Sequence, residues 1–310
     1  MNERNKRSTI KSGLSSLSKY SIKDVERLCG IKAHTIRIWE QRYGLIKPER
    51  TDTNIRYYSN EELKKLLNVS LLLKHGTKIS HICQLSQDEI GKRITEIEQT
   101  EKTQEQFYDF NIDQLLLAMV DFNEIRVNKL IDGSIQKFGM ESSMYNLLIP
   151  FLSKVGIMWR TGEINVMQEH FTTNIIRQKI ICSTERLPSS IAGLDESYLL
   201  FLPNNETHEI GLVFANYLIK KSGKRVLYAG QSLPVEDVVE FSNRHYPKYL
   251  LAFFSAGYNK NSQRTYIKTL SENIKYAKIL VAKPNYDHEP NIEYPNIEYL
   301  NNFETLKKYL

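Results

Sequence analysis

The 310-residue sequence has little cysteine, no long apolar run and fewer acidic than basic residues. Its three cysteines, Cys29, Cys83 and Cys182, are widely spaced and odd in number. This usage excludes a disulfide framework or a cysteine zinc site and indicates buried thiols of a cytosolic protein. No apolar run is long enough to span a membrane, and no signal-peptide pattern is present. We therefore expect a cytoplasmic protein.

Recognisable catalytic motifs are lacking as well. The sequence contains no Ser-His-Asp arrangement, no paired acid and base, and no phosphate-binding P-loop that can be defended. Its hydrophobic content of 41% and charged content of 25% are those of an ordinary globular protein, and its length allows two or three domains. We therefore expect a non-enzymatic protein with several domains.

Positive charge is concentrated near the N-terminus. Residues 1–80 contain 17 lysines and arginines against 8 aspartates and glutamates, a net charge of +9. The remaining residues contain 25 and 28, a net charge of −3. Binding to nucleic-acid phosphates requires such a basic segment, although a basic stretch alone is often only a solvated surface.

The same basic segment has the pattern of a helix-turn-helix between residues 20 and 59. Ser21 can cap a first helix, which Gly30 ends. A second helix is predicted from about His34 to Arg42 and stops before a further glycine. Residues 54–58 are expected to form a small β wing. Two short helices joined by a tight turn are typical of DNA-binding heads.

The run T-I-R-I-W-E-Q-R-Y-G-L-I from residue 35, followed by R-Y-Y-S from residue 56, resembles the DNA-binding head of the MerR family of transcription regulators. The match extends from about Ser18 to Lys74. The resemblance implies a winged helix-turn-helix that binds double-stranded promoter DNA as a dimer, at an operator with two half-sites. The DNA-binding residues expected from this match are Thr35, Arg37, Trp39, Arg42, Tyr43, Arg56 and Tyr57.

The pattern of the chain changes twice after the head. Four helical patterns in series predict a four-helix bundle. They cover about residues 112–120, 124–138, 142–160 and 166–185. Short apolar runs then alternate with helical stretches, which predicts a flavodoxin-like, doubly wound parallel sheet. The expected strands are about 198–202, 225–229, 249–254, 279–282 and 297–300.

The expected fold class is therefore multidomain α and α/β. The predicted domains are a disordered arm at 1–18, a winged-helix head at 19–92, a linker at 93–106, a four-helix bundle at 107–188 and a flavodoxin-like domain at 195–310.

Two groups of residues in the second half indicate a ligand site. In the bundle, Trp159 is followed after nine residues by Glu169 and His170. After the first predicted strand, the motif E-T-H-E-I-G begins at Glu206 and contains His208. Loops that follow strands lie at the ligand-binding end of such sheets. A histidine there can bind a metal while a carboxylate orients its ring, although a lone histidine is more often an ordinary surface or core residue.

With the bundle and the sheet, these residues resemble the cobalamin-binding module shared by methionine synthase and the light-sensing CarH/LitR regulators, from about residue 106 to 310. The resemblance implies cobalamin as the cofactor, with His208 as the ligand of its cobalt. It also implies that the bundle covers the upper face of the corrin and that Ser255 faces the nucleotide tail. The cofactor-binding residues expected from it are Trp159, Glu169, His170, Glu206, His208, Gly211 and Ser255.

The sequence departs from that module at three places. Lys283 and Pro284 stand where the module has two glycines, and we expect their side chains to crowd the route of the tail. The residues after Ser255 keep only half of the module's pattern. Arg160 stands where light-sensing members carry a histidine that captures cobalt after photolysis, which argues against light sensing.

We expect a sequence-specific transcription regulator with a cobalamin-type sensory half that acts as a homodimer or higher homo-oligomer. In an alternative interpretation, the second half no longer binds cobalamin and responds to a partner protein or another ligand. A third interpretation is a corrinoid enzyme component. It is disfavoured because the module is accompanied by a DNA-binding head and not by a substrate barrel.

Overall fold

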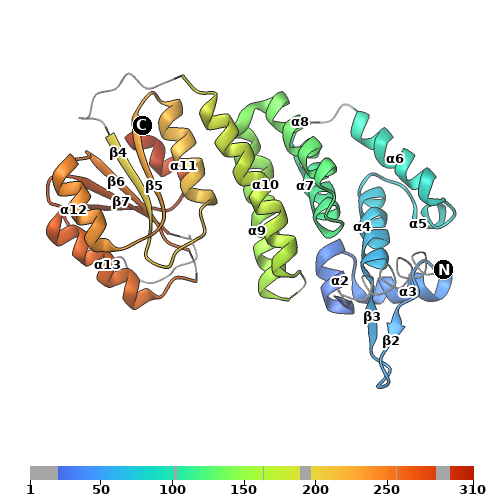
Figure 1. The fold of residues 1–310 in the computed structure, drawn as a ribbon. Coiled ribbons are helices and arrows are strands. Elements are labelled where there is room, and N and C mark those ends of the chain that lie inside the picture. The colour runs from blue at the N-terminus through green and yellow to red at the C-terminus, as the bar shows by residue number, and fades with distance from the viewer. Residues whose placement is uncertain (1–19, 101–102, 163, 189–196, 256, 284–293) are drawn as a thin grey trace, which may run out of the picture. The chain divides into compact units, whose positions relative to one another are not determined.

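The computed structural model describes residues 20–100, 103–162, 164–188, 197–255, 257–283 and 294–310. The expected disordered arm lies outside these ranges, as do Ala256 and Pro284. The chain divides into two compact units, residues 1–175 and residues 176–310, whose elements are labelled in Figure 1. Among the described helices, none is long and apolar enough to cross a membrane.

The first unit begins with the predicted winged helix-turn-helix. Its elements are β1 (Tyr20–Ser21), α2 (Ile22–Cys29), α3 (Ala33–Tyr43), β2 (Glu49–Arg50), β3 (Arg56–Tyr58), α4 (Asn60–Lys74), α5 (Ile79–Ile82) and α6 (Gln87–Gln99). The three short strands pair antiparallel in the order β1-β3-β2. Ser21 and Asp24 form a reciprocal capping box at the start of α2, and left-handed Gly30 ends that helix at a φ of 70°.

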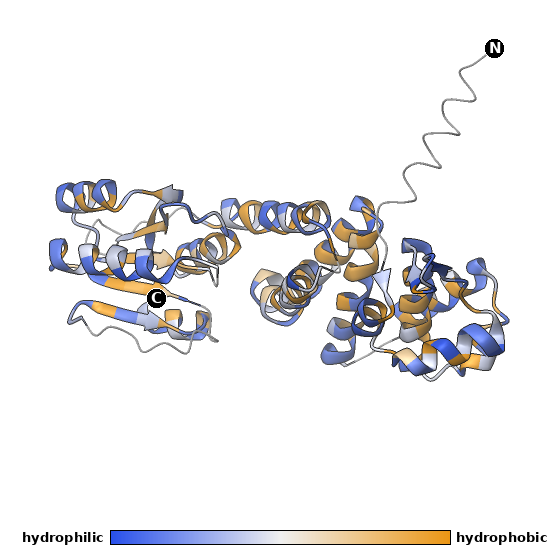
Figure 2. Ribbon diagram, turned by 90° about the horizontal axis from the view of Figure 1, so that it is seen from below, coloured by the Kyte–Doolittle hydropathy of each residue, from blue (hydrophilic) through white to orange (hydrophobic). Residues whose placement is uncertain are grey.

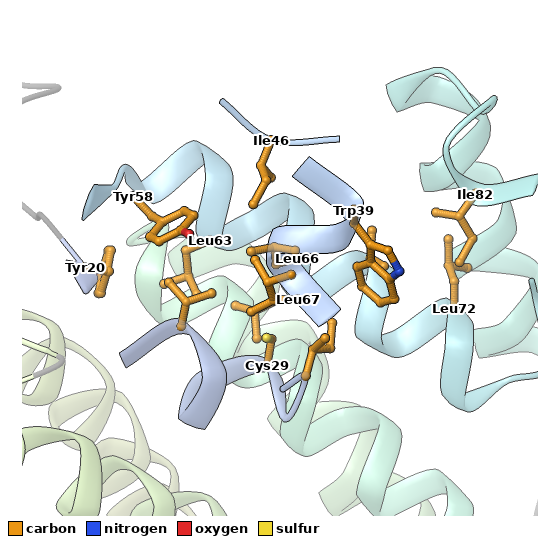
Figure 3. Packing of buried hydrophobic residues seen from close by; sticks show 14 of the residues in the cluster. Tyr20, Cys29, Trp39, Ile46, Tyr58, Leu63, Leu66, Leu67, Leu72 and Ile82 are labelled. Atoms are coloured by element: carbon orange, nitrogen blue, oxygen red, sulfur yellow. The ribbon is translucent and has the colours of Figure 1, made fainter. Parts of the chain in front are cut away.

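The core of this head extends beyond the segment predicted for it. Figure 3 shows part of the core, where the ring of Trp39 lies among buried side chains that include Leu72 of α4 and Ile82 of α5. Ile90 of α6 and Val120, from the first bundle helix, belong to the same cluster of buried residues. In the first half of the linker expected at 93–106, α6 continues as a helix to Gln99, and Ile94 and Ile97 pack against the head core.

The bundle contains the four predicted helices, although the first begins at Gln104 and not at about residue 112. It consists of α7 (Gln104–Val120), α8 (Glu124–Ser143), a π-helical turn (Met144–Leu148), α9 (Ile149–Arg160) and α10 (Val166–Glu185). Gly139 breaks the helical geometry inside α8 with a φ of 80°, which a residue with a side chain would adopt only under strain. The last helix, α10, crosses from the first unit into the second.

The second unit is the predicted doubly wound sheet. Its elements are β4 (Ser197–Pro203), α11 (Ile210–Lys221), β5 (Arg225–Leu233), α12 (Val235–His245), β6 (Tyr249–Phe253), α13 (Lys260–Asn273), β7 (Lys278–Ala282), β8 (Ile297–Leu300), α14 (Phe303–Leu306) and a 3-10 turn (Lys307–Tyr309). All strands are parallel in the order β5-β4-β6-β7-β8. Figure 2 shows hydrophobic strands beside helices with hydrophilic outer faces.

The strand order places a topological switch point between β4 and β6. The chain leaves β4 toward β5 on one side and returns to β6 on the other. Loops that leave these two strands therefore diverge at their carboxyl ends, where ligands bind in sheets of this type. His208 follows β4 and Ser255 follows β6, so both lie at this end.

Candidate functional site

Helix α3 carries five of the seven residues expected to contact DNA, and four of these five are exposed or half-buried. Arg37 and Arg42 are exposed, and the Arg42 guanidinium lies 5.3 Å from the centre of the Tyr43 ring. The hydroxyl of the half-buried Thr35 lies 3.3 Å from Nε2 of the neighbouring histidine. Trp39 is only 8% exposed and packs in the head core, so little of its side chain is available to contact DNA as expected. Its spacing of three residues from the buried Ile36 places both on the inner side of the helix.

The two residues expected on the wing already have partners inside the head. Arg56 donates from Nε to both carboxylate oxygens of Glu40, at 3.0 and 3.3 Å. Glu40 lies on α3, and it is also 3.8 Å from Nη2 of Arg50. The Tyr57 hydroxyl donates to the Glu49 carboxylate. The contacts of Glu40 fasten the wing to α3, and the motif itself gave no signal for Glu40.

The bundle holds the expected cap residues at the adjoining ends of two helices. Trp159 lies in the last turn of α9 and is 52% exposed, which is unusual for a tryptophan. In the first turns of α10, Nε2 of His170 lies 3.3 Å from a carboxylate oxygen of Glu169. Val166 and Met167, at the start of the same helix, are also exposed. Exposed apolar side chains therefore lie on both helices near the turn between α9 and α10.

In the second unit, Glu206 organises the loop after β4. One carboxylate oxygen accepts hydrogen bonds from the backbone N–H groups of Thr207 and His208, at 2.9 and 3.0 Å, and lies 2.7 Å from Nδ1 of His208. The other accepts from the backbone N–H of Ser255, at 2.8 Å. The side chain of Glu206 is thereby held between the loops that follow β4 and β6.

The protonation of Glu206 follows from these contacts. Burial raises the pKa of this carboxyl, but the hydrogen bonds from His208 and Ser255 outweigh burial and lower the pKa to about 2. The residue is therefore an anion at neutral pH. As an anion it can accept a hydrogen bond from Nδ1 of His208, and this contact holds the imidazole ring in place. The His208 side chain is 76% exposed, whereas that of Glu206 is 3% exposed.

A second buried carboxylate, which the sequence did not indicate, holds the other side of the loop. Glu209 accepts from Arg177 Nε at 2.6 Å, from the Tyr228 hydroxyl at 2.6 Å and from Gln231 Nε2 at 2.9 Å. Burial raises the pKa of this carboxyl, and the bonds from Arg177 and Tyr228 reverse that effect and lower it. The loop is thus tied to α10 and β5 as well as to β6.

A cavity of about 270 Å³ opens beside His208. Gly211, Phe253, Ser255 and Lys283 are among its lining residues. A Cβ atom at Gly211 would lie 2.8 Å from the Phe253 ring, so glycine allows the close approach of that ring. Nζ of Lys283 lies 5.4 Å from the centre of the Tyr299 ring, in a cation–π contact. The expected crowding by Pro284 falls outside the described residues.

Comparisons with known proteins agree with the order of these sites along the chain. The family described as MerR HTH family regulatory protein matches residues 20–89, and the family described as B12 binding domain matches residues 111–182. This chain is a MerR-type DNA-binding regulator with a B12-binding domain. The regulator is 26% identical over 221 residues to the transcriptional repressor CarH of Myxococcus xanthus, which covers 71% of this chain and 73% of that protein.

A second relative is the transcriptional repressor CarA of the same organism. It is 27% identical over 215 residues, which are 69% of this chain and 68% of CarA. Among solved structures, a monomethylamine corrinoid protein of Methanosarcina barkeri superposes with a TM-score of 0.49 at 16% identity, over 66% of this chain and 96% of that one. A likeness of this strength adds no functional argument. The two regulators are homologous over most of the chain, and this favours the regulator over a corrinoid enzyme component.

Proposed function

We propose that the protein controls transcription in the cytoplasm by binding promoter DNA as a homodimer or larger homo-oligomer, and that cobalamin bound by its second half is the signal. The DNA-binding part rests on the basic winged-helix head, whose outer α3 surface carries Arg37 and Arg42. Two of its relatives are named transcriptional repressors, which supports a function in transcription regulation over an enzymatic function.

The observation that carries the cobalamin proposal is the exposed His208 ring with its Nδ1 held by a buried carboxylate. Cobalamin supplies a cobalt ion that accepts a nitrogen ligand, and an imidazole oriented by a carboxylate suits that place. The cavity beside His208 would receive part of the nucleotide tail. Trp159, Glu169 and His170 would cover the other face of the corrin.

Gel filtration after incubation with cobalamin tests this proposal. We expect the full-length protein to retain cobalamin and to show the shifted visible bands of histidine-ligated cobalt. His208→Ala should abolish the shift. His245→Ala is a matched control, because His245 is an exposed histidine in the last turn of α12, outside the loop.

Two results would contradict the cobalamin proposal. One is the absence of retained cobalamin in the wild type, which would favour the alternative that the second half responds to another ligand or a partner protein. If Lys283→Gly with Pro284→Gly then restored binding, the crowding of the tail would be the cause. The other is retention with shifted bands that survives His208→Ala, which would place the site elsewhere.

A further inference from the structure

Helix α3 exposes an apolar residue that the contacts described above do not explain. The residues at positions 34, 38 and 41 are spaced by four and three, so they form one stripe along the helix, and all three are exposed. At 3.6 residues per turn, Ile38 lies about 200° around the helix from Ile36, which is fully buried. Ile38 therefore lies at the middle of the outer side, with 50% of its surface exposed.

The surroundings of Ile38 indicate the chemistry of its partner. Exposed Arg37 and Arg42 flank it, and His34 and Gln41 precede and follow it on the stripe. Ile38 is the one large hydrophobic side chain exposed on α3, all of whose residues are described. A protein interface would need a broader apolar patch than one side chain. A single apolar group within a basic, polar surface instead matches the major groove of DNA, where thymine presents a methyl group beside polar base edges.

We propose that Ile38 determines part of the DNA sequence specificity by contacting the C5 methyl group of a thymine in the major groove. This inference rests on the proposed function as a promoter-binding regulator and adds which base feature α3 recognises. A dimer presents α3 twice, so each half-site of a two-fold symmetric operator contains one such thymine.

The test begins with duplexes enriched from a random-sequence pool by the full-length protein. Each thymine of the enriched site is replaced in turn by deoxyuridine, which removes only the methyl group. Affinities are measured for the wild type, for Ile38→Ala and for Ile125→Ala. Ile125 is a matched control because it is an 84% exposed isoleucine on α8, outside the head.

We expect one thymine per half-site whose replacement weakens wild-type binding about fourfold, the factor that burial of one methyl group corresponds to. Replacing this thymine in both half-sites should then weaken binding about 15-fold. Ile38→Ala should bind the thymine-containing duplex more weakly than the wild type by a similar factor. Its affinity should not change when that thymine is replaced by deoxyuridine. Ile125→Ala should behave as the wild type. Because Ile38 is exposed, Ile38→Ala should leave the melting temperature nearly unchanged.

Three results would overturn the inference. In two of them the protein still binds the enriched site specifically: the wild type is indifferent to deoxyuridine at every thymine, or Ile38→Ala keeps the full sensitivity. These results refute the role of Ile38 and leave the proposed function standing. In the third, the wild type prefers no sequence over random DNA, which refutes the proposed function and this inference with it.

Discussion

Replacing Glu206 by glutamine isolates the contribution of the buried charge behind His208. The substitution keeps the shape of the side chain but replaces one carboxylate oxygen by an NH₂ group. This group cannot accept the hydrogen bonds that the replaced oxygen receives. The pKa of Glu206 is lowered from 4.5 to about 2 in the folded protein. At about 1.4 kcal/mol for each pH unit, the ionised carboxylate contributes about 3 kcal/mol to the free energy of unfolding at pH 7.

The sign of the pH dependence follows from the lowered pKa. A depressed carboxyl pKa stabilises the fold fully above the unfolded value of 4.5, and this contribution is lost as the pH falls toward about 2. Glu206→Gln, which resembles the protonated acid, should therefore differ from the wild type by about 3 kcal/mol at pH 7 and by about 1 kcal/mol at pH 3.

Urea denaturation of the full-length proteins at both pH values measures this difference. The unfolding measurement should report on the sheet of the second unit, for example through the hydrogen exchange of the backbone amides of β4 and β6. Glu236→Gln, an exposed glutamate in the first turn of α12, controls for the general loss of a negative charge in this domain. A difference below about 1 kcal/mol at pH 7, or one that does not change with pH, would refute the reasoning.

Three further predictions follow from particular contacts. A fragment of residues 1–95 should fold alone, because it keeps all buried residues of the head core except Val120, but its circular dichroism should show melting at a lower temperature than the head in the full chain. An unchanged melting temperature would contradict the packing of α7 on the head. Gly211→Ala should lower the free energy of unfolding by about 1–3 kcal/mol in urea, because its Cβ would lie 2.8 Å from Phe253, and an unchanged midpoint would argue against that packing. Glu40→Gln should weaken DNA binding in a titration as Arg56→Ala does, because their ion pair fastens the wing. Tighter binding by Glu40→Gln would instead show that Glu40 competes with phosphate for the arginine.

Much of the fold could be predicted because its signals are local. Ser21 with Asp24 and Ser59 with Glu62 are capping pairs three residues apart, and both form capping boxes in the structure. The apolar runs of the second half became strands whose order is that of the predicted fold class. The packing of α7 on the head was missed, because a helical stripe such as that of Val120 shows that a residue is buried but not which element buries it.

The residues of the two candidate sites were also predicted where the signal is local in sequence and missed where it is not. The alignment of the motif placed Trp39 on the DNA, although its helical spacing from Ile36 indicated the inner side of α3. The exposed His208 was found because E-T-H-E-I-G is a contiguous motif. Its partner Glu206 lies in the same motif and was expected. The contact between Glu206 and Ser255 was not predictable, since they are 49 residues apart in sequence and only the switch point of the sheet brings them together.

The contacts within each unit hold a different element in place, the His208 loop in the second unit and helix α7 in the first. In the second unit, the His208 loop is held on both sides by buried carboxylates, so it can present its imidazole to a ligand with little reordering. In the first unit, Asp113 of α7 lies 2.5 Å from Nζ of Lys74 on α4 and 3.5 Å from Nζ of Lys154 on α9. Because α7 also contributes Val120 to the head core, a displacement of α7 within the bundle would disturb the packing behind the DNA-binding helices.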